Sequence, residues 1–135
     1  MRLIPVSAVD VRAIFPIIYG TLKPAVDLND GFEMQDVENA LVRNEMQMWL
    51  ADNGEEITGV GITQIVKYPQ KKTCLLLFTA GVNWASWRHL LTDIEDWATQ
   101  MGCDDFEFIG RRGWERKGLD DYTPTNTVYN KKLRG

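Results

Sequence analysis

The residues best suited to chemistry in this sequence lie near its C-terminal end, in the stretch "GRRGWERKGL" (residues 110–119). An indole stands there among cationic side chains of the kind that bind phosphate groups and acidic surfaces. Residues 111–135 hold 7 basic and 3 acidic side chains, whereas residues 1–110 hold 8 basic and 16 acidic ones. A cationic segment on an anionic body predicts an anionic ligand, an acidic protein partner or nucleic acid as its target.

The rest of the composition argues against several other kinds of site. His89 is the only histidine, so we expect neither a histidine-based metal centre nor a Ser-His-Asp triad, and no metal. Cys74 and Cys103 lack C-x-x-C spacing, and we expect two reduced thiols that pack as small apolar groups. No apolar run is long enough for a membrane span, and the N-terminus lacks a signal-peptide core. We therefore expect a cytoplasmic protein without membrane contact.

The elements that would position such residues form one domain over residues 1–135. The first strand is expected over residues 1–6, followed by a helix that Pro24 ends and a second helix over residues 34–43. Asn53-Gly54 is a strong hairpin signal between two extended runs. The apolar stretch 73–81 predicts a central strand, so residues 46–80 are expected to form an antiparallel meander.

The second half of the chain changes to a helical period. Apolar residues recur at helical spacing over residues 84–101, and Gly102 is suited to end that helix. A strand over residues 104–110 should run parallel to the strand before the helix, because a helical crossover joins them. A short helix over residues 111–118 and a last strand over residues 125–133 follow. The predicted order is β-α-α-β-β-β-α-β-α-β, an α/β fold whose mixed sheet is antiparallel early and has a central parallel pair.

This order resembles the GNAT fold of acetyl-CoA-dependent N-acetyltransferases, over essentially the whole chain. In that family the parallel strands splay apart, the pantetheine arm of acetyl-CoA lies in the gap, and a loop with the pattern [R/Q]-x-x-G-x-[G/A] wraps the pyrophosphate. The resemblance implies acetyl-CoA as the cofactor. It places the cofactor-binding residues at Gly81, Val82, Asn83, Trp84, Ala85, Arg111 and Arg112.

Both family motifs are altered here. Val82 falls where Arg or Gln belongs, Ala85 at the first glycine and Trp87 at the last small residue. The stretch "WERKGL" occupies the place of the family's Y-x-x-x-G-F, so Trp114 replaces the tyrosine that protonates the departing CoA thiolate. An indole N–H does not act as an acid in this pH range. The resemblance therefore implies degenerate cofactor and proton-donor motifs.

Other residues could supply the missing acid and base. Tyr122, on the turn after the short helix, is the candidate proton donor. A carboxylate near the splayed strands is needed to receive the proton of the amine. Glu107 on the second strand of the parallel pair is the candidate, with Glu33 before the second helix as another on the acceptor side.

A narrower resemblance concerns the role of the protein. The stretch 110–114, the closing "VYNKKL" and the small size resemble GNAT-like proteins of tailed phages and prophages, some of which are virion components. This implies a non-catalytic binding or virion-associated module whose phage or host partner contacts Arg111, Arg112, Trp114 and Arg116. The alternatives are an active acetyl-CoA-dependent N-acyltransferase and a nucleic-acid-binding accessory protein. The acidic body disfavours nucleic acid as the main ligand.

Overall fold

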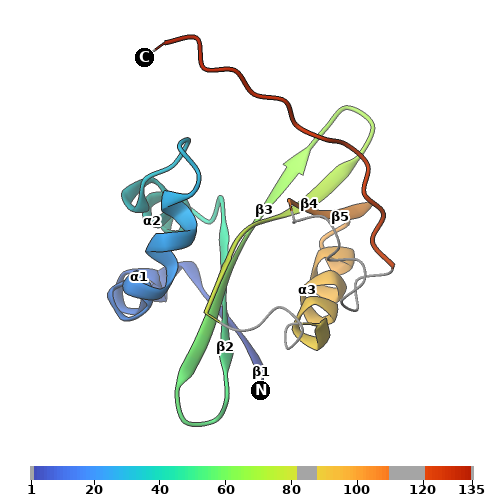
Figure 1. The fold of residues 1–135 in the computed structure, drawn as a ribbon. Helices are drawn as coiled ribbons and strands as arrows, with labels where there is room; N and C mark the ends of the chain where they lie inside the picture. Colours follow the sequence, from blue (N-terminus) through green and yellow to red (C-terminus); the bar gives the residue numbers. More distant parts are fainter. Residues whose placement is uncertain (1, 82–87, 110–120, 135) are drawn as a thin grey trace.

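The structure, a computed structural model, describes residues 2–81, 88–109 and 121–134. Figure 1 shows a sheet with helices on both of its faces. Along the chain the elements are β1 (Arg2–Val6), the 3-10 turn η1 (Ala8–Asp10), α1 (Val11–Asp27), α2 (Met34–Val42), β2 (Gln47–Asp52), β3 (Ile57–Lys67), β4 (Lys72–Ala80), α3 (Arg88–Gln100) and β5 (Asp105–Phe108).

The five strands of the sheet lie in chain order, β1-β2-β3-β4-β5. Neighbours from β1 to β4 are antiparallel, and β5 is parallel to β4. The hairpin between β2 and β3 turns at the predicted place, where the Asn53 N–H donates to the Glu56 carbonyl (3.2 Å) and Gly54 has φ 97°. The mixed sheet with a parallel pair, expected from the sequence, is confirmed.

Two helical layers enclose the sheet. α1 and α2 pack on one face, over a large apolar cluster that includes residues of β2, β3 and β4. α3 covers the other face and buries Leu90, Leu91, Ile94 and Ala98. It ends where the glycine predicted it, since Gly102 follows with φ 83°. Within the described residues, no helix is both long and apolar enough to cross a membrane.

The first helix is longer than predicted. Pro24 does not end α1, which continues to Asp27 and contains Pro16 as well. The proline ring would crowd the carbonyl four residues earlier and removes one hydrogen-bond donor. The packing of Leu22 and Val26, both completely buried on either side of Pro24, overrides that local cost.

The predicted last strand is wrong. Residues 125–133 form no strand and pair with none in the part of the chain that the structure describes. A strand is stable only when its backbone groups find partners, and β-propensity does not supply them. The short helix expected over residues 111–118 lies outside the described residues.

Candidate functional site

The site begins where the two parallel strands part. β4 pairs with β5 only from Thr73 to Leu76, whose partner is Phe108, the last residue of β5. β4 itself runs on to Ala80, and over this final part its partner is β3. The side of β4 that faced β5 therefore presents backbone N–H and C=O groups with no strand opposite them among the described residues. We call this opening the fork.

A β-bulge marks the start of the fork. Leu76 pairs with Thr63 and Phe78 pairs with Ile62, so Leu77 is an extra residue in β4. Strand side chains alternate between faces, and one inserted residue reverses the alternation. Leu76 accordingly belongs to the cluster under α3, whereas both Leu77 and Phe78 pack in the cluster under α1 and α2. The bulge thus turns the strand at the point where β5 leaves it.

The fork also lies near the loop between α1 and α2. The Phe32 ring packs edge-on against Phe78, with 5.8 Å between the ring centroids. Glu33, the next residue, caps α2, and its N–H donates to the Asp36 carboxylate (2.8 Å). Beside it, α1 and α2 enclose a hollow of 370 Å³. Its walls are Phe15, Tyr19, Lys23, Asp27, Glu33, Met34, Gln35 and Glu38. The acceptor-side candidate therefore lines a hollow on the α1–α2 face.

Gly81 closes β4 in a conformation that only glycine readily adopts. Its φ is 99°, and a Cβ at this position would overlap the carbonyl oxygen of Thr58 and stand 2.8 Å from the Cα of Gly59. The close approach of β3 explains why the residue is a glycine. A role in phosphate binding stays a prediction for Gly81. The other predicted loop residues, Val82 to Ala85, lie outside the described residues, as do Arg111, Arg112 and Trp114.

Glu107 lies one residue before the end of β5. Phe106 and Phe108 pack in the cluster under α3, so the intervening side chain points toward the opposite face, and Glu107 is exposed. It pairs in register with Leu75, just before the fork opens. The structure thus places Glu107 and Glu33 on the same side of the sheet, away from α3.

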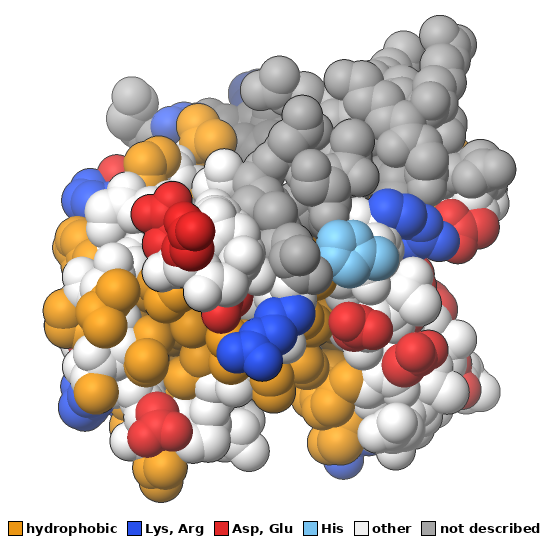
Figure 2. Space-filling model, turned by 90° about the horizontal axis from the view of Figure 1, so that it is seen from below, with side chains coloured by type: hydrophobic (Ala, Val, Ile, Leu, Met, Phe, Trp, Pro, Cys, Tyr) orange, Lys and Arg blue, Asp and Glu red, His pale blue; other side chains and the backbone are white. Residues whose placement is uncertain are grey.

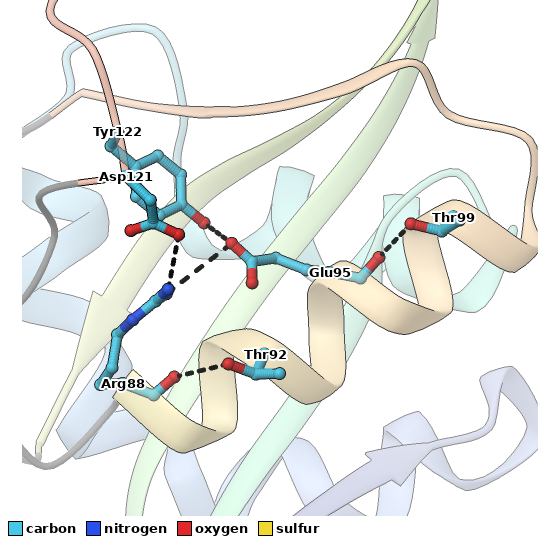
Figure 3. A network of polar contacts seen from close by, with 6 residues as sticks. All are labelled: Arg88, Thr92, Glu95, Thr99, Asp121 and Tyr122. Carbon is cyan, nitrogen blue, oxygen red and sulfur yellow. Dashed lines mark hydrogen bonds and ion pairs between the residues drawn. The ribbon is translucent and has the colours of Figure 1, made fainter.

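Tyr122 lies on the α3 side. Its ring packs edge-on against Phe108 (5.1 Å between centroids) and Phe106 (6.2 Å). Its hydroxyl donates to the Glu95 carboxylate of α3 (Figure 3). Burial, reinforced by that carboxylate, raises the pKa of Tyr122 well above its usual range. The Tyr122 hydroxyl therefore keeps its proton at neutral pH. In this structure it donates that proton in a hydrogen bond to Glu95 and not to a CoA thiolate.

Arg88 completes a polar cluster with these residues. Its guanidinium bonds to Asp121 (2.6 Å), lies 3.8 Å from Glu95 and sits over the Tyr122 ring, 5.8 Å from the centroid. We call Arg88, Glu95, Asp121 and Tyr122 the clasp, because together they tie the segment after β5 to α3. Sequence reasoning missed Arg88 and Glu95. The available signal was the polar series 88, 92, 95 and 99, which follows one face of α3.

The cysteines and the possible metal ligands among the described residues do not indicate a second reactive site. Both cysteines are free, as expected, and burial raises the pKa of Cys74 to about 12, which keeps it a thiol. Within the described ranges no cluster of three or more His, Cys, Asp or Glu side chains could hold a metal ion. Figure 2 shows acidic, basic and apolar side chains interspersed on the end of the molecule where the β2–β3 hairpin lies.

Comparison with solved structures decides the fold. An aminoglycoside acetyltransferase from an uncultured soil metagenomic sample, in complex with trehalose, superposes with a TM-score of 0.69 at 14% identity, covering 98% of this chain and 96% of that one. A ribosomal-protein-alanine N-acetyltransferase from Brucella melitensis biovar Abortus 2308 gives 0.66 at 11%, with 100% of both chains covered. The chain has the GNAT fold.

A third structure with the GNAT fold contains the expected cofactor. It is a predicted acetyltransferase from Clostridium acetobutylicum with acetyl-CoA, and it gives a TM-score of 0.68 at 10% identity, covering 98% of this chain and 96% of that one. No protein-family model matches the sequence, and no curated protein matches it. At these identities the likeness establishes the fold alone.

Proposed function

We propose that this protein binds an acyl-CoA thioester in the fork and transfers the acyl group to an amine. The observation that carries the proposal is the fork itself, in which β4 continues past the end of β5 with a bulge at Leu77. The pantetheine arm of CoA contains two amides and is nearly extended. An open strand edge offers such an arm the hydrogen bonds that a neighbouring strand would otherwise make.

Backbone groups of the chain would then bind the cofactor and stabilise the charge that develops during the reaction. N–H groups of β4 that point into the fork can donate to the thioester oxygen as negative charge develops on it. The described part of α3 begins at the same end of the sheet, and its positive N-terminal end favours the phosphates. The attacking amine forms the new C–N bond, and the C–S bond breaks with its electron pair leaving on sulfur.

The proton transfers need less help than in a typical acid-assisted reaction. A thiol has a pKa of about 8.5, so CoA can leave as a thiolate close to neutral pH without a strong side-chain acid. We therefore assign Tyr122 no part in this step, since its hydroxyl already donates to Glu95. Glu33 and Glu107 remain the candidate carboxylates for the proton lost by the amine, because both lie on the face opposite α3.

The first experiment is a thermal-unfolding titration with acetyl-CoA, with desulfo-CoA and ATP as controls. A ligand at 100 times its Kd stabilises the folded state by about 2.7 kcal/mol, which a melting curve resolves. We expect acetyl-CoA and desulfo-CoA to stabilise the protein and ATP to do so less. Thiol release in the presence of a panel of amines then tests transfer. No stabilisation at millimolar acetyl-CoA would contradict the proposal.

A second candidate is a GNAT-fold module that binds a partner without catalysis. It is favoured by the bond from Tyr122 to Glu95, which occupies the tyrosine that could have replaced the missing proton donor. Its partner surface would be the cationic stretch with Arg111, Arg112, Trp114 and Arg116, and the resemblance to phage-encoded proteins makes a virion component one version of it. Acetyl-CoA binding without thiol release, over a broad amine panel, would favour this candidate over the transferase.

A further inference from the structure

The turn between β2 and β3 holds an asparagine followed by a glycine, Asn53-Gly54, the only such pair in the sequence. An asparagine side chain can react with the backbone nitrogen of the next residue, which closes a five-membered succinimide ring and releases ammonia. A side chain on that next residue hinders the attack, and glycine has none. Nothing lies within 4 Å of the place where a Cβ of Gly54 would be, and residues 53–56 are all exposed. The turn is therefore open to this reaction.

The nucleophile of this reaction, the backbone nitrogen of Gly54, already has a base beside it. The Gly54 N–H donates to Oδ1 of Asp52, and the two heavy atoms are 2.9 Å apart. A peptide N–H gives up its proton reluctantly, so a carboxylate at hydrogen-bonding distance can assist the attack as a general base. Asp52 is the last residue of β2, pairs in register with Arg2 of β1, and has its carboxylate 3.7 Å from the Arg2 guanidinium. The sheet thus holds the base in place.

The electrophile is the side-chain amide of Asn53. Its Oδ1 atom accepts hydrogen bonds from the backbone N–H groups of Glu55 (2.9 Å) and Glu56 (3.0 Å). Two such donors stabilise the negative charge that develops on a carbonyl oxygen when a nucleophile adds to its carbon. Because Gly54 lies between Asn53 and these donors in the chain, the same bonds hold the side chain folded over the Gly54 peptide. A nucleophile and an electrophile held close together react faster than freely moving ones.

We propose that Asn53 is a site of self-modification, at which the turn promotes closure of the succinimide ring. The Gly54 nitrogen forms a bond to Cγ of Asn53, and its proton passes to the Asp52 carboxylate. The bond from Cγ to the amide nitrogen then breaks, and the leaving nitrogen takes that proton and departs as ammonia. Water opens the ring at either of its carbonyls, which gives aspartate or isoaspartate. The reaction needs water alone and is independent of any acyl transfer.

The two products change the turn in different ways. Aspartate adds a negative charge beside Asp52, Glu55 and Glu56 and keeps the length of the main chain. Isoaspartate adds the same charge and also a carbon atom to the main chain. That carbon lies next to the residue whose N–H donates to the Glu56 carbonyl (3.2 Å), so it disturbs the closing hydrogen bond of the turn. The modified hairpin is therefore more acidic in both forms and less regular in one.

The test is peptide mapping by mass spectrometry after the full chain has been kept at neutral pH in water enriched in heavy oxygen, with digestion afterwards in ordinary water. Each ring that water opens takes up one heavy oxygen atom, so the label excludes protein that was modified earlier. We expect the label at Asn53. Asn29 is the internal control, because its Oδ1 also accepts a backbone bond, from the Gly31 N–H (2.8 Å), but the residue after it is Asp30. It should take up far less label.

Two substitutions separate the base from the strand pairing that holds it. Asp52→Asn keeps the shape of the side chain and removes its charge, so it should slow the labelling of Asn53 in the folded protein by about 10-fold or more. Arg2→Gln removes the ion pair and keeps the carboxylate, and it should leave the rate nearly unchanged. In guanidinium chloride, where the chain is unfolded, Asp52→Asn should change the rate little, because the carboxylate is no longer held beside the Gly54 nitrogen.

Two results would overturn the proposal. One is a folded protein that takes up no label at Asn53 under conditions in which the unfolded chain does, since the turn would then protect the asparagine. The other is equal labelling of the folded wild type and the folded Asp52→Asn variant, since the carboxylate would then take no part. Circular dichroism of each variant shows whether it is folded when the rates are compared.

Discussion

Gly81 is the residue whose identity the backbone constrains most tightly. We expect Gly81→Ala to destabilise the protein by about 2 kcal/mol or more, because a left-handed φ costs an L-residue about 1–2 kcal/mol and the new Cβ also strikes the β3 backbone. Urea unfolding measures the loss.

Gly54 supplies a matched control for this substitution. Its φ of 97° is nearly the same, but a Cβ there meets nothing within 4 Å. Gly54→Ala should therefore show the conformational cost alone, about 1–2 kcal/mol. Equal losses at the two positions would mean that the contact with Thr58 and Gly59 does not constrain Gly81.

A substitution at Tyr122 distinguishes a structural role of this residue from a catalytic one. We expect Tyr122→Phe to lower the free energy of unfolding by about 1 kcal/mol, the usual net contribution of a hydrogen bond, and to leave any acyl transfer nearly unchanged. The exposed Tyr129→Phe is the control for stability. Unfolding midpoints and rates of thiol release are the measurements. A loss of kcat in the range of about 10²–10⁴-fold, without a loss of stability, would instead identify Tyr122 as the general acid.

At the scale of elements, the bulge in β4 can be tested by deleting its extra residue, Leu77. Deleting Leu77 removes the bulge and makes Phe78 follow Leu76 directly, still opposite Ile62 and still facing Phe32 and the α1–α2 cluster. Only the partly buried Leu77 side chain is lost from that cluster, so we expect a loss of stability of about 1–2 kcal/mol. If the bulge is what opens the fork, acetyl-CoA binding should be lost as well.

Deletion of Glu55 is the matched control for the bulge. Glu55 lies in the exposed turn between β2 and β3, so one residue is removed there without changing which way any strand residue faces. Urea unfolding and the acetyl-CoA melting shift are the measurements for both deletions. If the Leu77 deletion keeps wild-type acetyl-CoA binding, the bulge is not what opens the fork.

Most of the elements follow from local signals in the sequence. The Asn53-Gly54 turn, the end of α3 at Gly102 and the central position of β4 were all predicted, because turn chemistry, a positive φ and an apolar run act over a few residues. The end of α1 was missed, since the burial of Leu22 and Val26 depends on a sheet formed later in the chain. The strand predicted over residues 125–133 was wrong for a related reason: β-propensity is a local property, whereas a strand also needs a pairing partner elsewhere, and no described strand provides one.

The site was harder to predict than the fold. The role of Gly81 in phosphate binding stays a prediction, and the closeness of β3, which the sequence did not indicate, is a separate reason for a glycine there. Nothing in the sequence indicated that the hydroxyl of Tyr122, the candidate proton donor, is hydrogen-bonded to Glu95 of α3. The bulge at Leu77 leaves no mark in a run of apolar residues, because leucine suits either face of the sheet.

For the whole molecule, binding of acetyl-CoA should raise the melting temperature, because the ligand binds the folded state and not the unfolded one. We expect the melting temperature to rise with the concentration of acetyl-CoA and to be independent of the concentration of the protein at saturating ligand. A melting temperature that stays constant up to millimolar acetyl-CoA would contradict binding in the fork.

The order of the strands has a consequence for how the chain is made. Because the sheet follows the chain, each new strand is added beside the one before it, and none has to be inserted between two that already pair. The most distant pairing comes first, since Arg2 meets Asp52 across both N-terminal helices. During synthesis on the ribosome the sheet can therefore grow at one edge only, and β5 is the last of the described strands to be added.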